Sequence, residues 1–434
     1  MSSPYLPNTD TDRSQMLREI GVGAAEELFR DIPEELRNAR FNLPAPLSEL
    51  ELKDELRRLA ALNTGMDDYA CFLGAGYYRH FIPGVIGHIT GRSEFYTAYT
   101  PYQPEISQGT LQAIYEYQSL VCQLTGMEVS NAGMYDGSTA AAEAVLMACR
   151  ITGREKAAVL ATVNPAYTEV IATYTGGGDI SVARVDPAAD SLPSGCACLV
   201  AQQPGFCGYF EDMTACARIA RDAGALLIVI VDPVSLGMFK SPADYGADII
   251  VAEGQALGNP VSFGGPALGI FTCRKKYLRQ MPGRIAGKTM DVDGKTGYVL
   301  TMQTREQHIR RERSTSNICT NEALVALAVV VYLATLGKTG LRRVAELCYH
   351  KAHYAADKIS RLKGYSPVSS RPFFNEFAVH CPAAPRRVNE ALREEGIIGG
   401  LDISDIADNG MLLCVTEVNT RQQIDKLVQV LGEL

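Results

Sequence analysis

Residues 225–237 read ALLIVIVDPVSLG, and this stretch decides the fold. A continuous apolar run that ends at an aspartate, Asp232, is typical of a strand covered by helices on both faces. Segments with helical spacing alternate with further runs of this kind, which predicts a large doubly wound α/β domain. The similar apolar runs are KAAVLAT at 156–162, ISVARV at 180–185, CACLVAQ at 196–202, ADIIVAE at 247–253 and ALGIFTC at 267–273.

Outside these strands the chain divides into an arm and a second domain. Residues 1–70 show helical spacing interrupted by prolines, which predicts a helical N-terminal arm. The large α/β domain is expected at 71–337, closing with the apolar helix NEALVALAVVVYLATLG at 321–337. Residues 338–434 carry fewer and shorter alternating patterns, which predict a small α+β C-terminal domain.

Composition and charge exclude several classes of protein. The chain has 434 residues, 49 of them acidic and 41 basic, with 47% apolar positions. A net charge of -8 without a Lys/Arg run argues against a nucleic-acid partner or an anionic membrane. The N-terminal sequence has acids and prolines where a signal peptide needs a basic and then an apolar run, so we expect a cytoplasmic protein. Twelve cysteines without a CxxC pair predict buried free thiols and no metal site.

The motif YDGSTAAAEAV begins a predicted helix with small and hydroxyl residues. Asp136, Gly137, Ser138 and Thr139 would place backbone N–H groups at the positive end of the helix dipole, where an anion can bind. The alternative is an ordinary helix cap. Asp232 ends its strand at the edge where ligands bind in open α/β sheets, and its alternative role is to cap the following turn.

A glycine-rich loop, GQALGNPVSFGGPALGIF at 254–271, joins two predicted strands. The order of helix start, strand-end aspartate and loop resembles that of aspartate-aminotransferase-like enzymes, which bind pyridoxal phosphate. That resemblance implies a PLP-dependent transferase fold with a large doubly wound domain and a small C-terminal domain. In those enzymes a lysine of the loop holds the cofactor as a Schiff base. This loop contains no lysine.

Longer motifs carry a closer resemblance. FLGAGYYRHFIP at 72–83, SEFYTAYTPYQPEISQG at 93–109 and QTREQHIRRERSTSNICTNEAL at 303–324 are similar to the P-protein family of the glycine cleavage system, specifically to the alpha subunit of its two-chain form. The resemblance implies an oxidoreductase of glycine catabolism that binds glycine through pyridoxal phosphate, releases CO2 and passes the aminomethyl group to the lipoyl arm of H-protein. T- and L-proteins are the implied functional partners.

The resemblance also implies that the catalytic lysine and the cofactor belong to the P-protein beta subunit. Alignment on the shared proline and Gly-Gly-Pro puts Gln255 at the lysine position, and a glutamine cannot form an imine. No catalytic residue is therefore expected in this chain, and no cofactor covalently bound to it. We interpret one group as a vestigial cofactor pocket: Gly137, Ser138, Thr139, Asp232 and Gln255.

Two segments are expected to be contributed to the partner's active site in an αβ or α2β2 assembly. They supply phenol, hydroxyl, amide and guanidinium groups, which suit phosphate or carboxylate recognition. The alternatives are interface packing for the tyrosines and a solvated charged turn for the residues from Arg305 to Arg311. The predicted residues are Tyr96, Tyr99, Thr100, Tyr102, Gln103, Glu105, Ser107, His308, Arg310, Ser316, Asn317 and Thr320.

Two other readings of the sequence stay open. One is a self-sufficient PLP decarboxylase or lyase with a displaced lysine, which the glutamine at 255 argues against. The other is a structural or regulatory paralogue that makes no direct catalytic contribution. A homodimer of the isolated chain is a further expectation.

Overall fold

The computed structural model describes residues 5–37 and 42–434, which form two compact units, Met1–Thr64 and Gly65–Leu434. The first unit consists of helices α1 (Asp10–Ile20), α2 (Glu34–Arg37) and α3 (Glu49–Ala60). Helices α1 and α3 begin with capping boxes at Thr9 and Ser48. Each N-cap hydroxyl accepts a hydrogen bond from the N3 backbone N–H, and the N3 carboxylate accepts one from the backbone N–H of the N-cap residue. Within the described residues of this unit, none of the three helices has a buried residue.

A seven-stranded mixed sheet forms the centre of the second unit, in the order β2-β8-β7-β6-β5-β3-β4. Strands β3 to β7 are parallel, as the continuous apolar runs predict, whereas β8 runs antiparallel to β7 and β2 antiparallel to β8. The strands are β2 (Val129–Ser130), β3 (Lys156–Leu160), β4 (Ser181–Val185), β5 (Cys198–Gln203), β6 (Leu226–Val231), β7 (Ile249–Glu253) and β8 (Gly269–Cys273).

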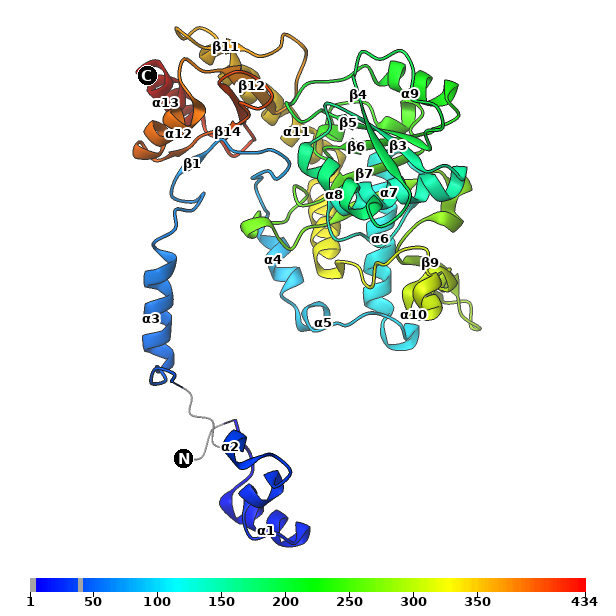
Figure 1. The fold of residues 1–434 in the computed structure, drawn as a ribbon, viewed down its shortest axis with the longest axis vertical. Helices are drawn as coiled ribbons and strands as arrows, with labels where there is room; N and C mark the ends of the chain where they lie inside the picture. The colour runs from blue at the N-terminus through cyan, green and yellow to red at the C-terminus, as the bar shows by residue number, and fades with distance from the viewer. Residues whose placement is uncertain (1–4, 38–41) are drawn as a thin grey trace. The chain divides into compact units, whose positions relative to one another are not determined.

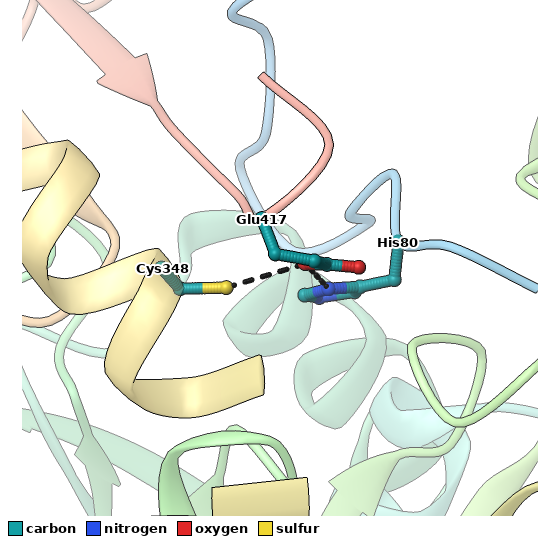
Figure 2. A group of neighbouring side chains, drawn as sticks. All are labelled: His80, Cys348 and Glu417. Atoms are coloured by element: carbon teal, nitrogen blue, oxygen red, sulfur yellow. Dashed lines mark hydrogen bonds and ion pairs between the residues drawn. The ribbon is translucent and has the colours of Figure 1, made fainter. Parts of the chain in front are cut away.

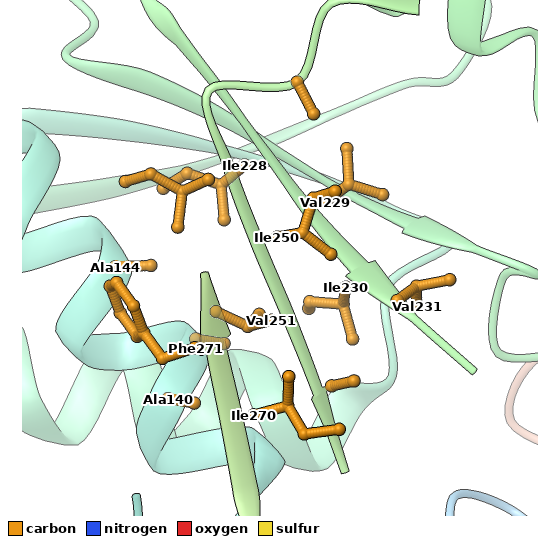
Figure 3. Close-up of a cluster of buried hydrophobic side chains, with 14 of the residues drawn as sticks. Ala140, Ala144, Ile228, Val229, Ile230, Val231, Ile250, Val251, Ile270 and Phe271 are labelled. Carbon is orange, nitrogen blue, oxygen red and sulfur yellow. The ribbon is translucent and has the colours of Figure 1, made fainter. Parts of the chain in front are cut away.

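Helices pack against this sheet, and small residues let one of them approach closely. Helix α7 buries Ala140 and Ala144 against the central strands, beside Val251 and Phe271 (Figure 3). The close approach places the beginning of α7 next to the end of β7, where the candidate site lies. The helices are α4 (Gly84–Thr90), α5 (Ser93–Tyr96), α6 (Gln108–Thr125), α7 (Gly137–Thr152), α8 (Pro165–Thr175) and α9 (Met213–Asp222).

Helix α11 spans Ala323–Ile359 and consists of two helical stretches with a kink at Gly337, so the first stretch ends at this glycine as predicted. Gly337 adopts φ 59° and ψ -175°, a break that a glycine accommodates, and the helix resumes beyond it. By length and composition α11 is apolar enough to cross a membrane, but half of its most apolar window is buried inside the protein, where it packs against α6 (Figure 1). A helix used in this way belongs to the core.

A second hydrophobic core lies under a four-stranded antiparallel sheet of order β11-β12-β15-β14. Residues near position 70 also belong to this core, since β1 (Ala70–Cys71) pairs with β13 (Ile397–Ile398) and Phe72 is fully buried there. The remaining elements are β9 (Ile285–Met290), β10 (Thr296–Thr301), α10 (Gln307–Arg310), β11 (Ser366–Pro367), β12 (Glu376–His380), α12 (Pro385–Glu394), β14 (Leu401–Asp402), β15 (Gly410–Cys414) and α13 (Arg421–Gly432).

Candidate functional site

The first candidate region, which we call the strand-end cluster, lies where β5, β6 and β7 end and α7 begins. It contains Asp136, Asp232, Glu253, Gln255 and Glu376. The Asp136 carboxylate accepts hydrogen bonds from the backbone N–H groups of Ser138 (2.7 Å) and Thr139 (2.9 Å). Asp136 is therefore the N-cap of α7, and its carboxylate uses two of the amides predicted to bind an anion.

Glu253, the last residue of β7, uses a further amide at this helix start. Its Oε2 accepts from the N–H of Gly137 (2.9 Å), and its Oε1 accepts from the N–H groups of Gln255 (2.8 Å) and Leu268 (3.1 Å). Burial raises the pKa of Glu253 to about 7, although these three amides act to lower it. The sequence pattern assigns Glu253 only to the end of a strand, so its side-chain role was not predicted.

Gln255, at the position aligned with the lysine, is buried and fully hydrogen-bonded by the backbone. Its Oε1 accepts from the N–H of Tyr78 (3.0 Å), and its Nε2 donates to the carbonyls of Tyr78 (3.1 Å) and Asn259 (2.7 Å). The amide thus joins the glycine-rich loop to the segment around Tyr78. A side chain that both donates and accepts is needed for this set of bonds.

Asp232 and Glu376 complete the cluster from two different sheets. Asp232 Oδ1 accepts from Val234 N (2.8 Å), the turn cap that the alternative interpretation predicts, while its buried Oδ2 has no hydrogen-bond partner among the described residues. Glu376 accepts from the N–H of Ala75 (2.6 Å) and from the hydroxyl of Tyr78 (2.7 Å), and burial raises its pKa to about 7. The cavity left between these groups is about 30 Å3, and its lining includes no lysine or arginine in the described chain.

Next to the cluster, His80 pairs with a carboxylate. His80 Nδ1 lies 2.7 Å from Glu417 Oε2, and the Cys348 thiol donates to the same oxygen over 3.4 Å (Figure 2). These side chain types could hold a metal ion, a site that the sequence analysis did not predict. Burial lowers the pKa of His80, but Glu417 and Asp232 outweigh burial and raise it. The pairing thus favours the protonated imidazole and the ionised carboxylate.

The second candidate region, which we call the Arg284 network, brings predicted residues from distant segments together. Arg284 is 2% exposed and donates to the Tyr102 hydroxyl (2.8 Å), the Thr320 hydroxyl (2.9 Å) and the Cys319 carbonyl (2.6 Å). Its Nε also lies 3.3 Å from Glu306 Oε2. The sequence analysis missed Arg284, although a lone arginine in the apolar string MPGRIAG is a signal of a buried, paired guanidinium.

Other predicted residues lie around this network. Thr100 and Thr320 place their hydroxyl oxygens 3.5 Å apart, and the rings of Tyr102 and His308 have centroids 4.8 Å apart. Beside them a cavity of about 230 Å3 opens to the surface, lined by residues that include Tyr96, Tyr99, Thr100 and Thr320. The structure therefore joins the two segments that the sequence analysis treated separately.

Several predicted residues lie apart from the network. Ser316 donates to Glu143 Oε1 (2.6 Å) in a separate depression that Asn317 also lines, and Ser107 is half-buried where α6 begins. Arg305, by contrast, is buried and donates to the carbonyls of Met281 and Gly283, so it is not free to bind an anion. Of the predicted residues outside the network and its cavity, the exposed ones are Gln103, Glu105, Arg310 and Asn317.

Comparisons with known proteins find relatives over the full length of the chain. A relative from Thermomicrobium roseum, named probable glycine dehydrogenase (decarboxylating) subunit 1, is 52% identical over 99% of each chain. A crystal structure of glycine decarboxylase (P-protein) of the glycine cleavage system, in inhibitor-bound form, superposes with a TM-score of 0.93 at 41% identity, covering 99% of this chain and 100% of the other.

A more distant structure bears on the fold alone. A C-DES mutant with glycine covalently linked to its PLP cofactor superposes with a TM-score of 0.59 at 12% identity, covering 81% of this chain and 94% of the other. The predicted PLP-dependent transferase fold is therefore confirmed. The sequence pattern of the glycine cleavage system P-protein family matches residues 3–431. With relatives of this identity over its full length, the chain belongs to the glycine cleavage system P-protein family.

Proposed function

We propose that this chain is the alpha subunit of a heteromeric glycine decarboxylase and completes the pyridoxal-phosphate site of a beta subunit. The assembly releases CO2 from glycine and transfers the aminomethyl group to the lipoyl arm of H-protein, with T- and L-proteins acting on the product. The proposed setting is the cytoplasm, in an αβ or α2β2 assembly. Pyridoxal phosphate, held by the partner subunit, supplies the electron sink for decarboxylation.

The filled strand-end cluster is the observation that carries the proposal. A cavity of about 30 Å3 has room for about one water molecule and not for a pyridine ring with a phosphate. The group at the lysine position, Gln255, is committed to three backbone bonds. The carboxyl groups of Asp232, Glu253 and Glu376 line the same space, and none of them supplies the cation or donor array that a phosphate dianion needs. The residues present therefore do not fit the cofactor.

The Arg284 network is the part of the chain proposed to serve the partner's site. Arg284 holds Tyr102 and Thr320 at fixed positions, while Tyr96 and Tyr99 remain exposed on the same segment. A rigid base with exposed phenols can orient groups across an interface at a low cost in conformational entropy. In the proposal these side chains bind and orient the substrate next to the partner's cofactor and exclude water from it.

The test compares the chain alone with the reconstituted pair. The isolated chain, incubated with pyridoxal phosphate and reduced with borohydride, should carry no lysine-linked cofactor by peptide mapping. Addition of the beta subunit should restore glycine-dependent exchange of CO2. A reduced lysine adduct in the isolated chain would support the self-sufficient enzyme instead. The structural or regulatory paralogue is not favoured by the family relationship, and unchanged turnover after substitution of Tyr99 and Thr320 together would revive it.

A further inference from the structure

We propose that His80, Cys348 and Glu417 form a binding site for a divalent transition-metal ion such as Zn²⁺. The three side chains come from distant parts of the sequence, since Glu417 is 337 positions from His80 and 69 from Cys348, and they meet as Figure 2 shows. Ligands this far apart follow no short spacing motif, which is why no metal site is predicted from the sequence. The proposal goes beyond the proposed function and does not depend on it.

The types and positions of the three side chains favour zinc. Thiolate, imidazole and carboxylate together are typical zinc ligands, whereas Mg²⁺ and Ca²⁺ take oxygen ligands. The ligand atoms of the three residues all lie within 4.8 Å of one another. His80 Nδ1 lies 2.7 Å and the Cys348 thiol 3.4 Å from the same Glu417 oxygen, Oε2. Such atoms are roughly 3.4–3.6 Å apart around tetrahedral zinc, so both contacts need to open by less than about 1 Å.

Neighbouring groups hold the Glu417 carboxylate in the orientation that a metal ligand needs. The backbone N–H of Phe81 donates to Glu417 Oε1 over 2.6 Å, which leaves Oε2 to face the imidazole and the thiol. The Lys351 ammonium donates to the backbone carbonyls of Glu417 and Asn419 and so fixes the segment that carries the carboxylate. Hydrogen bonds of this kind position the ligands of metal sites. The proposed site is therefore largely pre-formed.

Burial and charge also suit a bound dication. The side chains of His80 and Glu417 are 2% and 8% exposed, and Cys348 is fully buried. With a protonated imidazole, an ionised carboxylate and a neutral thiol, the group has no net charge. A dication that takes the place of the imidazole proton and the thiol proton also leaves the group neutral, because the thiolate and the carboxylate balance it. Binding therefore buries no unbalanced charge, and two protons pass to solvent.

The second ring nitrogen of His80 is placed as in many histidine ligands. His80 Nε2 is buried without a hydrogen-bond partner among the described residues, and so is Oδ2 of Asp232. Burial raises the pKa of Asp232, and His80 acts most strongly against that rise, so the two side chains are neighbours. A histidine that binds a metal through one nitrogen commonly donates its other N–H to a carboxylate. Asp232 is the carboxylate available for that role.

The experiment uses the full chain, treated with a chelator, dialysed and titrated separately with ZnCl2 and CoCl2. The zinc content after dialysis, measured by mass spectrometry, should reach one ion per chain, and Zn²⁺ should raise the Tm. Co²⁺ should give the near-ultraviolet charge-transfer band of a thiolate ligand. MgCl2 at the same concentration should change neither the Tm nor the spectrum. A chain that retains no stoichiometric zinc and shows no thiolate–cobalt band overturns the proposal.

Variants locate the bound ion. Cys348→Ser should weaken Zn²⁺ binding by at least about 10-fold and abolish the cobalt charge-transfer band, because the thiolate is lost. Glu417→Gln should weaken binding but keep the band. Cys198→Ala removes a thiol that is equally buried, and it should bind zinc as the unsubstituted chain does. If Cys348→Ser fails to fold, Glu417→Gln and the cobalt spectrum of the unsubstituted chain decide the question.

The exposed thiol of Cys319 provides the test for an adventitious ion. Cys319→Ala should leave the zinc content and the cobalt band unchanged. Loss of both in Cys319→Ala, with binding retained in Cys348→Ser, would mean an adventitious ion only and overturns the proposal. Metal content and cobalt spectra are measured on the isolated chain without pyridoxal phosphate, so their outcome is separate from that for the proposed function.

Discussion

The strand-end cluster and the Arg284 network belong to the same compact unit and handle buried charge in different ways. In the cluster, the carboxyl groups of Asp232, Glu253 and Glu376 surround a small space, and backbone amides and a tyrosine hydroxyl satisfy most of their oxygens. In the network a single guanidinium, that of Arg284, holds hydroxyls, carbonyls and one carboxylate from three segments.

The difference separates a closed site from one that faces outward. Backbone amides at the start of α7 and after β7 are already bonded to the acids of the cluster, so in the proposed function the cluster stabilises the fold and is not the cofactor site. In the network the Arg284 guanidinium holds the hydroxyls of Tyr102 and Thr320 in place. The neighbouring side chains of Tyr96 and Tyr99 stay exposed, with exposed fractions of 68% and 86%. In a fold that binds its cofactor at the strand ends, the region with ligand-ready groups is then the network.

The largest expected effect comes from removing the cation of the network. Arg284→Ala should lower the free energy of unfolding by about 3–5 kcal/mol, because it leaves the buried Glu306 carboxylate without its nearest partner. It should also reduce glycine-dependent CO2 exchange of the reconstituted pair by at least about 10-fold, a loss of about 1.4 kcal/mol in transition-state stabilisation. Urea unfolding and the exchange assay measure the two effects.

Two variants sharpen this result. Arg284→Lys keeps the positive charge but not the forked donors of the guanidinium, so its stability and activity should fall between those of Arg284→Ala and those of the unsubstituted chain. Arg386→Ala, on the exposed face of α12, should change the free energy of unfolding by less than about 0.5 kcal/mol. If Arg284→Ala were as stable as Arg386→Ala, the network would not be the rigid base that the proposed function needs.

The cluster should make stability depend on pH. Burial raises the pKa of Glu376 from its ordinary value of 4.5 to about 7, so the folded chain binds this proton more tightly than the unfolded chain. The stabilisation is fully present below pH 4.5 and is lost as the pH rises through about 7, a change of about 3 kcal/mol. Glu376→Gln should remove the share of this dependence that Glu376 carries, leaving that of Glu253, and be the more stable chain at pH 8, as urea unfolding across pH 4.5 to 8 would show.

Glu417 provides a control of opposite sign. Burial acts to raise its pKa, but His80 outweighs burial and lowers it, so its contribution is present above the unfolded value of 4.5 and lost as the pH falls. Glu417→Gln should therefore destabilise the chain at pH 8, where Glu376→Gln stabilises it. Equal signs for the two variants would contradict the assignment of a protonated carboxyl to the cluster.

Substitution at the aligned lysine position tests whether the cluster is closed by more than one residue. Gln255→Lys should not bind pyridoxal phosphate, because the Glu253 side chain still accepts from Gly137 N at the beginning of α7 and the cavity stays near 30 Å3. It should cost about 2 kcal/mol of stability, since the Tyr78 N–H loses its acceptor and an ammonium is buried. Borohydride reduction followed by peptide mapping, with Gln255→Leu as the control for packing, decides between a closed and a restorable site.

The fold was largely predictable because its signals are local. Each apolar run forms a strand, and the small residues after Asp136 form a helix. Burial on both faces of the sheet requires consecutive apolar residues, and close helix packing requires small residues at neighbouring positions, so both are visible in short stretches of sequence. Gly337 is a local signal of the same kind, since the helical stretch that begins at Ala323 ends at the kink at this glycine. The decisive site groups are not local. Glu253 bonds Gly137 from 116 positions away, and Arg284 bonds Tyr102 from 182 positions away.

The smallest effect on stability is expected at the exposed edge of the network. Tyr99 is 86% exposed, so Tyr99→Ala should change the free energy of unfolding of the isolated chain by less than about 0.5 kcal/mol. In the reconstituted pair it should still reduce CO2 exchange, because a phenol that the chain does not use for its own packing is available to the partner. Ile106→Ala, 82% exposed on the same segment, is the matched control for lost apolar surface. Equal loss of exchange in both variants would assign the segment to interface packing, whereas a loss confined to Tyr99→Ala would assign its hydroxyl to the partner's site.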